Sequence, residues 1–262
     1  MNILDTIVAK KKIEVAERKQ QIAVKELEQT KFFAAETLSL KQFLSDTNRT
    51  GIIAEYKRKS PSKGIINNHS TVEEVTVAYA AAASGISVLT DEDFFGGNLN
   101  DLVAATINKV PLLRKDFMID EYQIIEAKAY GASVILLIAA CLSPKQVKEL
   151  ATVAKNLGLE VLLEIHNEEE LQHICDEVDL VGVNNRNLKT FEVDINTSLQ
   201  LIHSIPADKL AIAESGISNT DTIVTLQQAG FKGFLIGENF MKEQNPAIAF
   251  AGFVKELKQK LA

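Results

Sequence analysis

From Gly51 onward, the chain repeats one pattern of hydrophobic and polar positions. A short run of apolar and β-branched residues ends in polar side chains, an amphipathic segment follows, and a glycine-containing turn leads into the next run. The pattern predicts strands at Ile52–Lys57, Val88–Asp91, Leu112–Phe117, Val134–Ala139, Val161–His166, Leu180–Asn184, Leu210–Glu214 and Gly233–Gly237. Near-continuous apolar strands that alternate with helices are typical of a parallel sheet covered on both faces.

The number of strand–helix units predicts the fold class. Eight units in about 210 residues match a closed (β/α)8 barrel, so we expect an α/β protein with a single TIM barrel over residues 51–262. A doubly wound sheet is the alternative, but its nucleotide-binding form usually has a glycine-rich turn after the first strand. Here that strand runs instead into Glu-Tyr-Lys-Arg-Lys-Ser-Pro-Ser-Lys-Gly at positions 55–64.

Residues 1–50 have a different pattern. Isoleucine, leucine and valine recur at roughly helical spacing among lysines and glutamates in the first twenty positions, and a shorter apolar cluster covers 38–44. We expect an N-terminal helical extension packed on the barrel. Two interpretations remain open, a solvated helix on the side of the barrel and a cover over one of its ends.

Composition narrows the class of protein. The net charge of the 262 residues is -7, which argues against a general nucleic-acid partner, and no apolar run reaches membrane-spanning length. Cys141 and Cys175 do not suggest a disulfide framework, and no basic, apolar leader is recognisable. We therefore expect a cytoplasmic protein that binds neither nucleic acid nor membrane. The oligomeric state stays open between a monomer and a weak homodimer.

Polar residues gather where the predicted strands end. Active sites of TIM barrels lie at the carboxyl ends of the strands. The residues there are Glu55, Lys57, Lys115, Glu164, His166, Asn184, Arg186, Glu214 and Ser215. Strand alternation places them on the same side as the expected interior residues Ile53, Leu113, Leu162, Gly182 and Ile212. Any one of them alone is as compatible with a water-facing rim, but repetition over five strands predicts a shared acid–base cavity. For His166 we expect a place at the rim or behind the site.

Two loops predict an anion site. Small residues follow the seventh and eighth strands, at 214–218 and 236–239, where barrel enzymes frequently bind a phosphate group. Ser60, Ser62 and Lys63 are placed to close over this site. The aromatic pair Phe94 and Phe95 follows the second strand and either walls an aromatic ligand or anchors its loop. The four histidines lack metal-ligand spacing, so we expect no metal site.

Several of these segments resemble one family in order and spacing. They are Ile-Ala-Glu-Tyr-Lys-Arg-Lys-Ser-Pro-Ser-Lys-Gly (53–64), Val-Leu-Thr-Asp-Glu-Asp-Phe-Phe-Gly-Gly (88–97), Leu-Arg-Lys-Asp-Phe (113–117), Leu-Glu-Ile-His (163–166), Gly-Val-Asn-Asn-Arg-Asn-Leu (182–188), Ala-Glu-Ser-Gly-Ile (213–217) and Ile-Gly-Glu (236–238). Over essentially the whole chain they resemble indole-3-glycerol phosphate synthase. The acidic run 91–93 departs from the family pattern and is expected to affect closure of its loop.

The resemblance implies a reaction and roles for single residues. The family closes the indole ring of 1-(2-carboxyphenylamino)-1-deoxyribulose 5-phosphate with loss of CO₂ and water, in tryptophan biosynthesis and without cofactor or metal. It implies Lys115 as general acid, Glu164 as acid–base residue of the dehydration, and Lys57 as partner of the substrate carboxylate. The other implied site residues are Glu55, Asn184 and Glu214 around the ribulose hydroxyls, Arg186 as a buried partner of the carboxylates, Ser60, Ser215, Gly216, Gly237 and Glu238 at the phosphate, and Phe95, Phe117, Leu136 and Leu188 around the anthranilate ring.

Two other functions remain as alternatives. One is a sugar-phosphate isomerase of the phosphoribosyl type, which tends to use an aspartate or cysteine base, whereas the inward set here consists of lysines and glutamates. The other is a non-catalytic barrel that binds a phosphorylated ligand. We expect no second, fused isomerase barrel.

Overall fold

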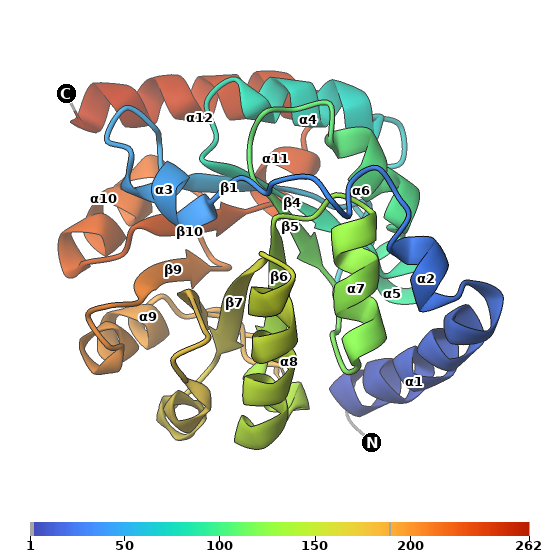
Figure 1. Cartoon of the computed structure of the whole chain (residues 1–262). Helices are drawn as coiled ribbons and strands as arrows, with labels where there is room; N and C mark the ends of the chain where they lie inside the picture. Colours follow the sequence, from blue (N-terminus) through green and yellow to red (C-terminus); the bar gives the residue numbers. More distant parts are fainter. Residues whose placement is uncertain (1–2, 189, 262) are drawn as a thin grey trace.

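The computed structural model describes residues 3–188 and 190–261 and is built around a closed barrel of parallel strands (Figure 1). Around the barrel the strand order is β1-β10-β9-β8-β7-β6-β5-β4. These strands are β1 (Ile52–Tyr56), β4 (Gly85–Leu89), β5 (Leu112–Lys115), β6 (Val134–Ile138), β7 (Glu160–Ile165), β8 (Leu180–Asn184), β9 (Leu210–Glu214) and β10 (Gly233–Ile236). The predicted TIM barrel is thereby confirmed.

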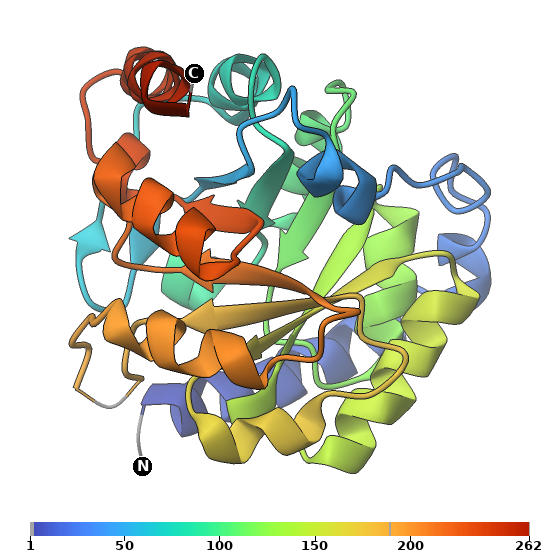
Figure 2. The same cartoon turned by 90° about the vertical axis from the view of Figure 1, so that its left-hand side faces the viewer.

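Helices surround the strands, as the turned view in Figure 2 shows. They are α4 (Val72–Ala80), α5 (Glu92–Phe95), α6 (Leu99–Ala105), α7 (Glu121–Ala129), α8 (Pro144–Asn156), α9 (Asn196–Leu201), α10 (Thr220–Ala229), α11 (Glu238–Met241) and α12 (Pro246–Leu261). Short 3-10 helices also occur, η1 (Ala139–Cys141), η2 (Glu168–His173) and η3 (Ile202–Ser204), and a small hairpin, β2 (Lys59–Ser60) and β3 (Gly64–Ile65), follows β1.

The strands are buried on both faces, which explains their near-continuous apolar sequences. Alternate residues fill the barrel interior or pack against the helices. The interior cluster includes the predicted residues Ile53, Leu113, Leu162 and Ile212, whereas Tyr56 and Ile135 belong to the layer between strands and helices. The predicted division of each strand into an inward and an outward face is therefore confirmed.

The second strand begins earlier than predicted. The sequence pattern places it at Val88–Asp91, with Gly85 closing the preceding helix, whereas β4 spans Gly85–Leu89 and Gly85 pairs with Ile53. A Cβ atom on Gly85 would come within 2.7 Å of Leu40 Cδ1, so this glycine makes room for a side chain from the N-terminal segment. Its role is close packing, which the sequence pattern does not distinguish from a helix end.

That N-terminal segment closes the amino end of the barrel. Helix α3 (Leu40–Ser45) inserts Leu40 and Leu44 among the interior residues. The Glu160 carboxylate at the start of β7 accepts hydrogen bonds from the backbone N–H groups of Leu40 (2.8 Å) and Lys41 (3.1 Å), and from the hydroxyl of Ser39. A carboxylate at a helix N-terminus satisfies free N–H groups and complements the helix dipole.

The first helix of the extension lies apart from α3, beside α7 (Figure 1). Helix α1 (Ile3–Gln21) buries Ile7, Lys11 and Val15, spaced four residues apart on one face, and the short α2 (Val24–Leu27) follows. A fully buried lysine in the middle of an apolar stripe is unusual and requires charged partners.

Candidate active site

A single cation lies between two carboxylates where three strands end. Lys115 Nζ, at the end of β5, is 2.7 Å from Oε2 of Glu214 on β9 and 3.1 Å from Oε2 of Glu164 on β7. The side chain of Lys115 is 14% exposed, and those of Glu164 and Glu214 are 5% and 1% exposed. Three residues that the sequence pattern sends to the same end of the barrel therefore lie in direct contact.

All three groups are buried, but their neighbours shift their pKa values differently. Burial opposes the charge on Lys115, but Glu214 and Glu164 outweigh it and raise the pKa of the ammonium. Burial also favours the neutral form of Glu164, yet Lys115, His166 and Asn184 together lower its pKa. Among the described residues, Glu214 pairs with one cation, the shared Lys115, so burial and the nearby Glu164 raise its pKa to about 7. The centre therefore holds one ammonium, one carboxylate and one group that titrates near neutrality.

A second ion pair lies across the cavity on β1. Lys57 Nζ is 2.7 Å from Oε1 of Glu55, whose side chain is 5% exposed. Two glycines make room for the carboxylates of this layer. A Cβ atom on Gly237 would lie 2.5 Å from Oε1 of Glu55, and one on Gly182 would lie 2.2 Å from Oε1 of Glu214. Any side chain at these two positions would displace a carboxylate.

One cavity is lined by nearly all the residues predicted for the site. The lining includes Glu55, Lys57, Ser60, Phe95, Lys115, Phe117, Leu136, Glu164, Asn184, Arg186, Leu188, Glu214, Ser215 and Glu238. Gly216 and Gly237 adjoin it in sequence but do not line it. The lining also includes Ile3, Leu4 and Ile7 of α1, which the sequence did not predict for the site although their apolar spacing is visible there. Helix α1 thus covers part of the cavity. Of the two interpretations of the N-terminal helix, this favours a cover over one end of the barrel.

One wall of the cavity is apolar. The rings of Phe95 and Phe117 have centroids 6.1 Å apart at 39°, and Leu136 and Leu188 join them in the lining. Apolar residues of α1 extend this wall. The wall has the character of a site for a flat hydrophobic group.

The other end of the cavity is polar. Ser60 and Ser62 face each other with hydroxyl oxygens 3.4 Å apart, and Lys63 Nζ lies 3.8 Å from Oε1 of Glu238. Ser215 has a φ of 65°, in the left-handed region that residues other than glycine rarely adopt and that is found at functional sites. These residues come from the loops after β1, β9 and β10, as the sequence predicts for an anion site.

Arg186 differs from its expected place. It was expected to be a buried partner of the central carboxylates, but its side chain is 25% exposed and its Nη2 lies 3.7 Å from Oε2 of Glu238. Its Nη1 donates to the backbone oxygen of Phe191. Asn184 Oδ1 accepts from the backbone N–H of Arg186, which turns the chain outward after β8. Arg186 therefore belongs to the polar end of the cavity.

Behind the centre, a buried network of charges joins α1 to the barrel. Lys11 Nζ is 2.9 Å from both Asp91 and Asp116 and 2.7 Å from Glu14. On the far side, Arg114 Nη2 lies 3.1 Å from Asp116 and 2.8 Å from Glu126. Asp91 also caps α5 by accepting from the N–H of Phe94. Arg114 and Asp116 thus have partners on the surrounding helices α1 and α7, which agrees with their predicted outward direction.

Other features bear on the class of the site. Among residues 3–188 and 190–261, no group of three or more histidine, cysteine, aspartate or glutamate side chains is arranged to hold a metal ion. No helix within the same ranges is long and apolar enough to cross a membrane. Cys141 and Cys175 are free thiols.

A closed (β/α)8 barrel with a buried lysine and carboxylates at the carboxyl ends of its strands defines an enzyme of the TIM-barrel class. Sequence comparison identifies the family. The sequence model of indole-3-glycerol phosphate synthase matches residues 4–253. The chain belongs to the indole-3-glycerol phosphate synthase family, a family of carboxy-lyases of tryptophan biosynthesis, as the resemblance had implied.

Individual relatives agree with this membership. A protein named indole-3-glycerol phosphate synthase from Bacteroides thetaiotaomicron is 46% identical over 258 residues, which cover 98% of this chain and 99% of that protein. Proteins of the same name from Acinetobacter baumannii and a Polaromonas species are 43% and 40% identical, over 95% of this chain and 94% and 97% of theirs. A solved mutant tryptophan synthase alpha-subunit from Pyrococcus furiosus aligns with a TM-score of 0.62 at 16% identity, over 81% of this chain and 99% of that one, and shows the fold alone.

Proposed function

We propose that the chain converts 1-(2-carboxyphenylamino)-1-deoxyribulose 5-phosphate to indole-3-glycerol phosphate, CO₂ and water. The observation that carries the proposal is the position of Lys115, held between Glu164 and Glu214 at the centre of one cavity. The apolar wall fits the anthranilate ring, the polar end fits the phosphate, and the reacting carbonyl would lie between them.

Lys115 acts as the general acid of ring closure. Attack of the ring carbon on the carbonyl disrupts aromaticity and develops negative charge on the carbonyl oxygen. An ammonium kept charged by its raised pKa stabilises this charge and delivers its proton as the oxygen becomes an alkoxide. Because the site is buried, the interaction is stronger than it would be in water.

The carboxylates serve the later step and the sugar. Glu164, kept ionised by its neighbours, removes the proton during dehydration and returns one to the leaving hydroxyl. Oε1 of Glu214 is buried and accepts no hydrogen bond from any described residue, so a protonated Glu214 is free to donate to a substrate hydroxyl there. Asn184 and Glu55 complete the polar surroundings of the ribulose chain.

Lys57 and the serines position the two anionic ends of the substrate. The Lys57 side chain is 16% exposed and pairs with Glu55, so its ammonium is available to the substrate carboxylate at the cavity mouth. Ser60 after β1, Ser215 and Gly216 after β9, and Gly237 and Glu238 after β10 supply hydroxyl and backbone N–H groups for the phosphate. The ligand is one small phosphorylated molecule, with no cofactor.

A product assay tests the proposal. Purified protein incubated with the carboxyphenylaminodeoxyribulose phosphate is expected to generate indole fluorescence and to release one CO₂ per indole formed. An isomerase would change the sugar without either signal. A non-catalytic barrel would bind the compound, measurable by calorimetry, without consuming it.

A further inference from the structure

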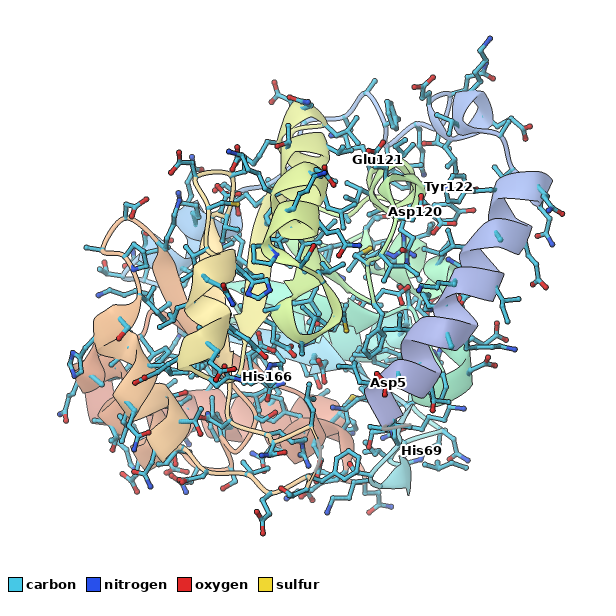
Figure 3. The ribbon with its side chains drawn as sticks, turned by 90° about the horizontal axis from the view of Figure 1, so that it is seen from below. Asp5, His69, Asp120, Glu121, Tyr122 and His166 are labelled. Carbon is cyan, nitrogen blue, oxygen red and sulfur yellow. The ribbon has the colours of Figure 1, made fainter. Side chains whose placement is uncertain are left out.

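His166 forms a link between the centre of the site and a second carboxylate. Its Nε2 lies 3.2 Å from Oε1 of Glu164, and its Nδ1 lies 3.1 Å from Oε2 of Glu170. The same oxygen of Glu170 accepts from the backbone N–H of His166 at 2.8 Å, which holds the Glu170 carboxylate beside the ring. Figure 3 shows His166 beside the helical turn that follows β7, and Asp5 on α1.

Exposure increases along this row of side chains. Glu164, His166 and Glu170 are 5%, 9% and 14% exposed. Glu164 also contacts Lys115 through its other oxygen, Oε2. The contacts therefore run without a break from Glu170 at the outside to Lys115 at the centre.

The proposed reaction requires a proton from outside. The substrate carboxylate is ionised at neutral pH and leaves as neutral CO₂, so each turnover consumes one proton. In ring closure the new C–C bond forms, the carbonyl π pair moves to oxygen, and that oxygen takes the proton of Lys115. Loss of CO₂ returns the electron pair of the broken C–C bond to the ring. Dehydration removes one proton from carbon and adds one to the leaving hydroxyl, so the proton still missing is that of Lys115.

We propose that Glu170 and His166 return this proton from solvent to Glu164, and through it to Lys115. His166 releases its Nε2 proton to Oε1 of Glu164. A half-turn of the neutral ring then brings the bare nitrogen to Glu170, which delivers to it a proton taken up from solvent. A half-turn of the Glu164 carboxyl group then presents the proton to Nζ of Lys115. His166 is thus a positioning residue that acts through Glu164, and this inference rests on the proposed function.

The charges around the ring favour this direction. Burial opposes the imidazolium, but the two carboxylates raise the pKa of His166 to about 10, so both nitrogens carry a proton at neutral pH. While Lys115 is charged, Glu164 stays ionised between two cations. Once Lys115 has given up its proton, Glu164 loses its main stabilising charge, its pKa rises, and it accepts the proton of His166.

The groups that neighbouring elements bring to Glu164 and Glu170 are a thiol, an amide and a carboxyl group. Burial, together with Glu164, Glu170 and Asp5, raises the pKa of the Cys141 thiol on η1 to about 12, so the thiol stays neutral. Asn184 on β8 contributes a neutral amide to Glu164. Asp5 approaches from α1 as the remaining acidic group.

The decisive experiment uses His166→Gln in the full chain, with His203→Gln on the exposed η3 as the matched control. Turnover by His166→Gln is expected to fall roughly 10²-fold, the range of a lost proton-transfer group, and to rise again with the concentration of imidazole buffer at constant pH. His203→Gln and wild type should not respond to the buffer. A His166→Gln variant with wild-type kcat, or with a low kcat that imidazole does not raise, would overturn the proposal.

A second variant, Glu170→Gln, tests the proposal even if His166→Gln does not fold. Glu170→Gln keeps the shape of the outer residue, and its kcat should fall and show the same buffer response while KM stays within about 2-fold of wild type. An unchanged kcat in Glu170→Gln would contradict delivery through this carboxylate. If wild type itself forms no indole, the proposed function fails together with this inference. If wild type is active while both variants match it, only this inference fails.

Discussion

Lys11 Nζ on α1 lies 2.9 Å from Oδ1 of Asp116, the residue that directly follows Lys115 on the chain. Both side chains are fully buried, and burial of Asp116 is outweighed by Lys11 and Arg114, which lower the pKa of its carboxyl group. The N-terminal helix is therefore joined by a buried charge to the strand end that presents the central lysine.

Removing this charge should destabilise the protein and loosen the site. In Lys11→Met, Asp91 and Asp116 lose a common partner inside the protein, and breaking one side of a buried ion pair typically costs about 3–5 kcal/mol. We expect a lower thermal midpoint and a higher KM, because Ile3, Leu4 and Ile7 of the same helix line the cavity. Lys12→Met, at an exposed neighbouring position, is the control and should change neither value.

Replacement of the central lysine should abolish most of the turnover. Lys115→Ala removes the proton donor and the charge opposite the developing alkoxide, so kcat should fall by roughly 10²–10⁴-fold while substrate still binds. Steady-state indole fluorescence and calorimetric binding measure the two effects separately. Lys109→Ala, on the exposed surface, serves as control. Near-normal turnover by a folded Lys115→Ala protein would exclude the assigned role.

Loss of Lys57 should affect binding as well as chemistry. Lys57→Ala removes the proposed partner of the substrate carboxylate and leaves Glu55 without its cation. We expect KM to rise and kcat to fall, which initial-rate measurements over a range of substrate concentrations will show. The assignment would not survive an unchanged KM, provided that KM reports binding.

The pH dependence should identify Glu214. Its pKa is raised to about 7 by burial and by Glu164, so it is protonated below and ionised above this pH in the free protein. Ionisation adds a negative charge to a cavity that must accept a substrate with both a carboxylate and a phosphate group, so kcat/KM should fall as pH rises through about 7. Glu214→Gln stays neutral and should lack this transition, even if its activity is lower throughout. Persistence of the transition in that variant would assign it to another group.

A substitution at the amino end of the barrel should lower stability without changing catalysis. Glu160→Ala removes the acceptor of two backbone N–H groups and a hydroxyl at the start of α3, and helix caps typically contribute about 0.5–2 kcal/mol. The midpoint of denaturant unfolding should decrease while kcat stays close to wild type. Glu168→Ala, which replaces an exposed glutamate, should leave the midpoint unchanged. Equal midpoints for the two variants would contradict the capping role.

The direction of side chains along a strand follows a regular alternation and was predictable from the sequence. Features that depend on contacts between distant residues were not. Alternation along β5 was sufficient to place Lys115 in the cavity and Arg114 on the outer face, where it pairs with Glu126 of α7. The true start of β4 depends on contact between Gly85 and Leu40, which lies far away in the chain. The exposure of Arg186 likewise depends on how the chain turns after β8, and no periodicity describes that turn. The buried partners of Lys11, Asp91 and Asp116, come from two other segments, so the helical pattern of α1 did not predict how its charge is neutralised.

The cap of α3 by Glu160 has a consequence for synthesis of the chain on the ribosome. Leu40 and Lys41 are translated about 120 residues before the carboxylate that satisfies their N–H groups. At a translation rate of roughly 5–20 residues per second, α3 is synthesised several seconds or more before Glu160. Helix α3, near the start of the chain, therefore reaches its final place only after the start of β7 has been synthesised.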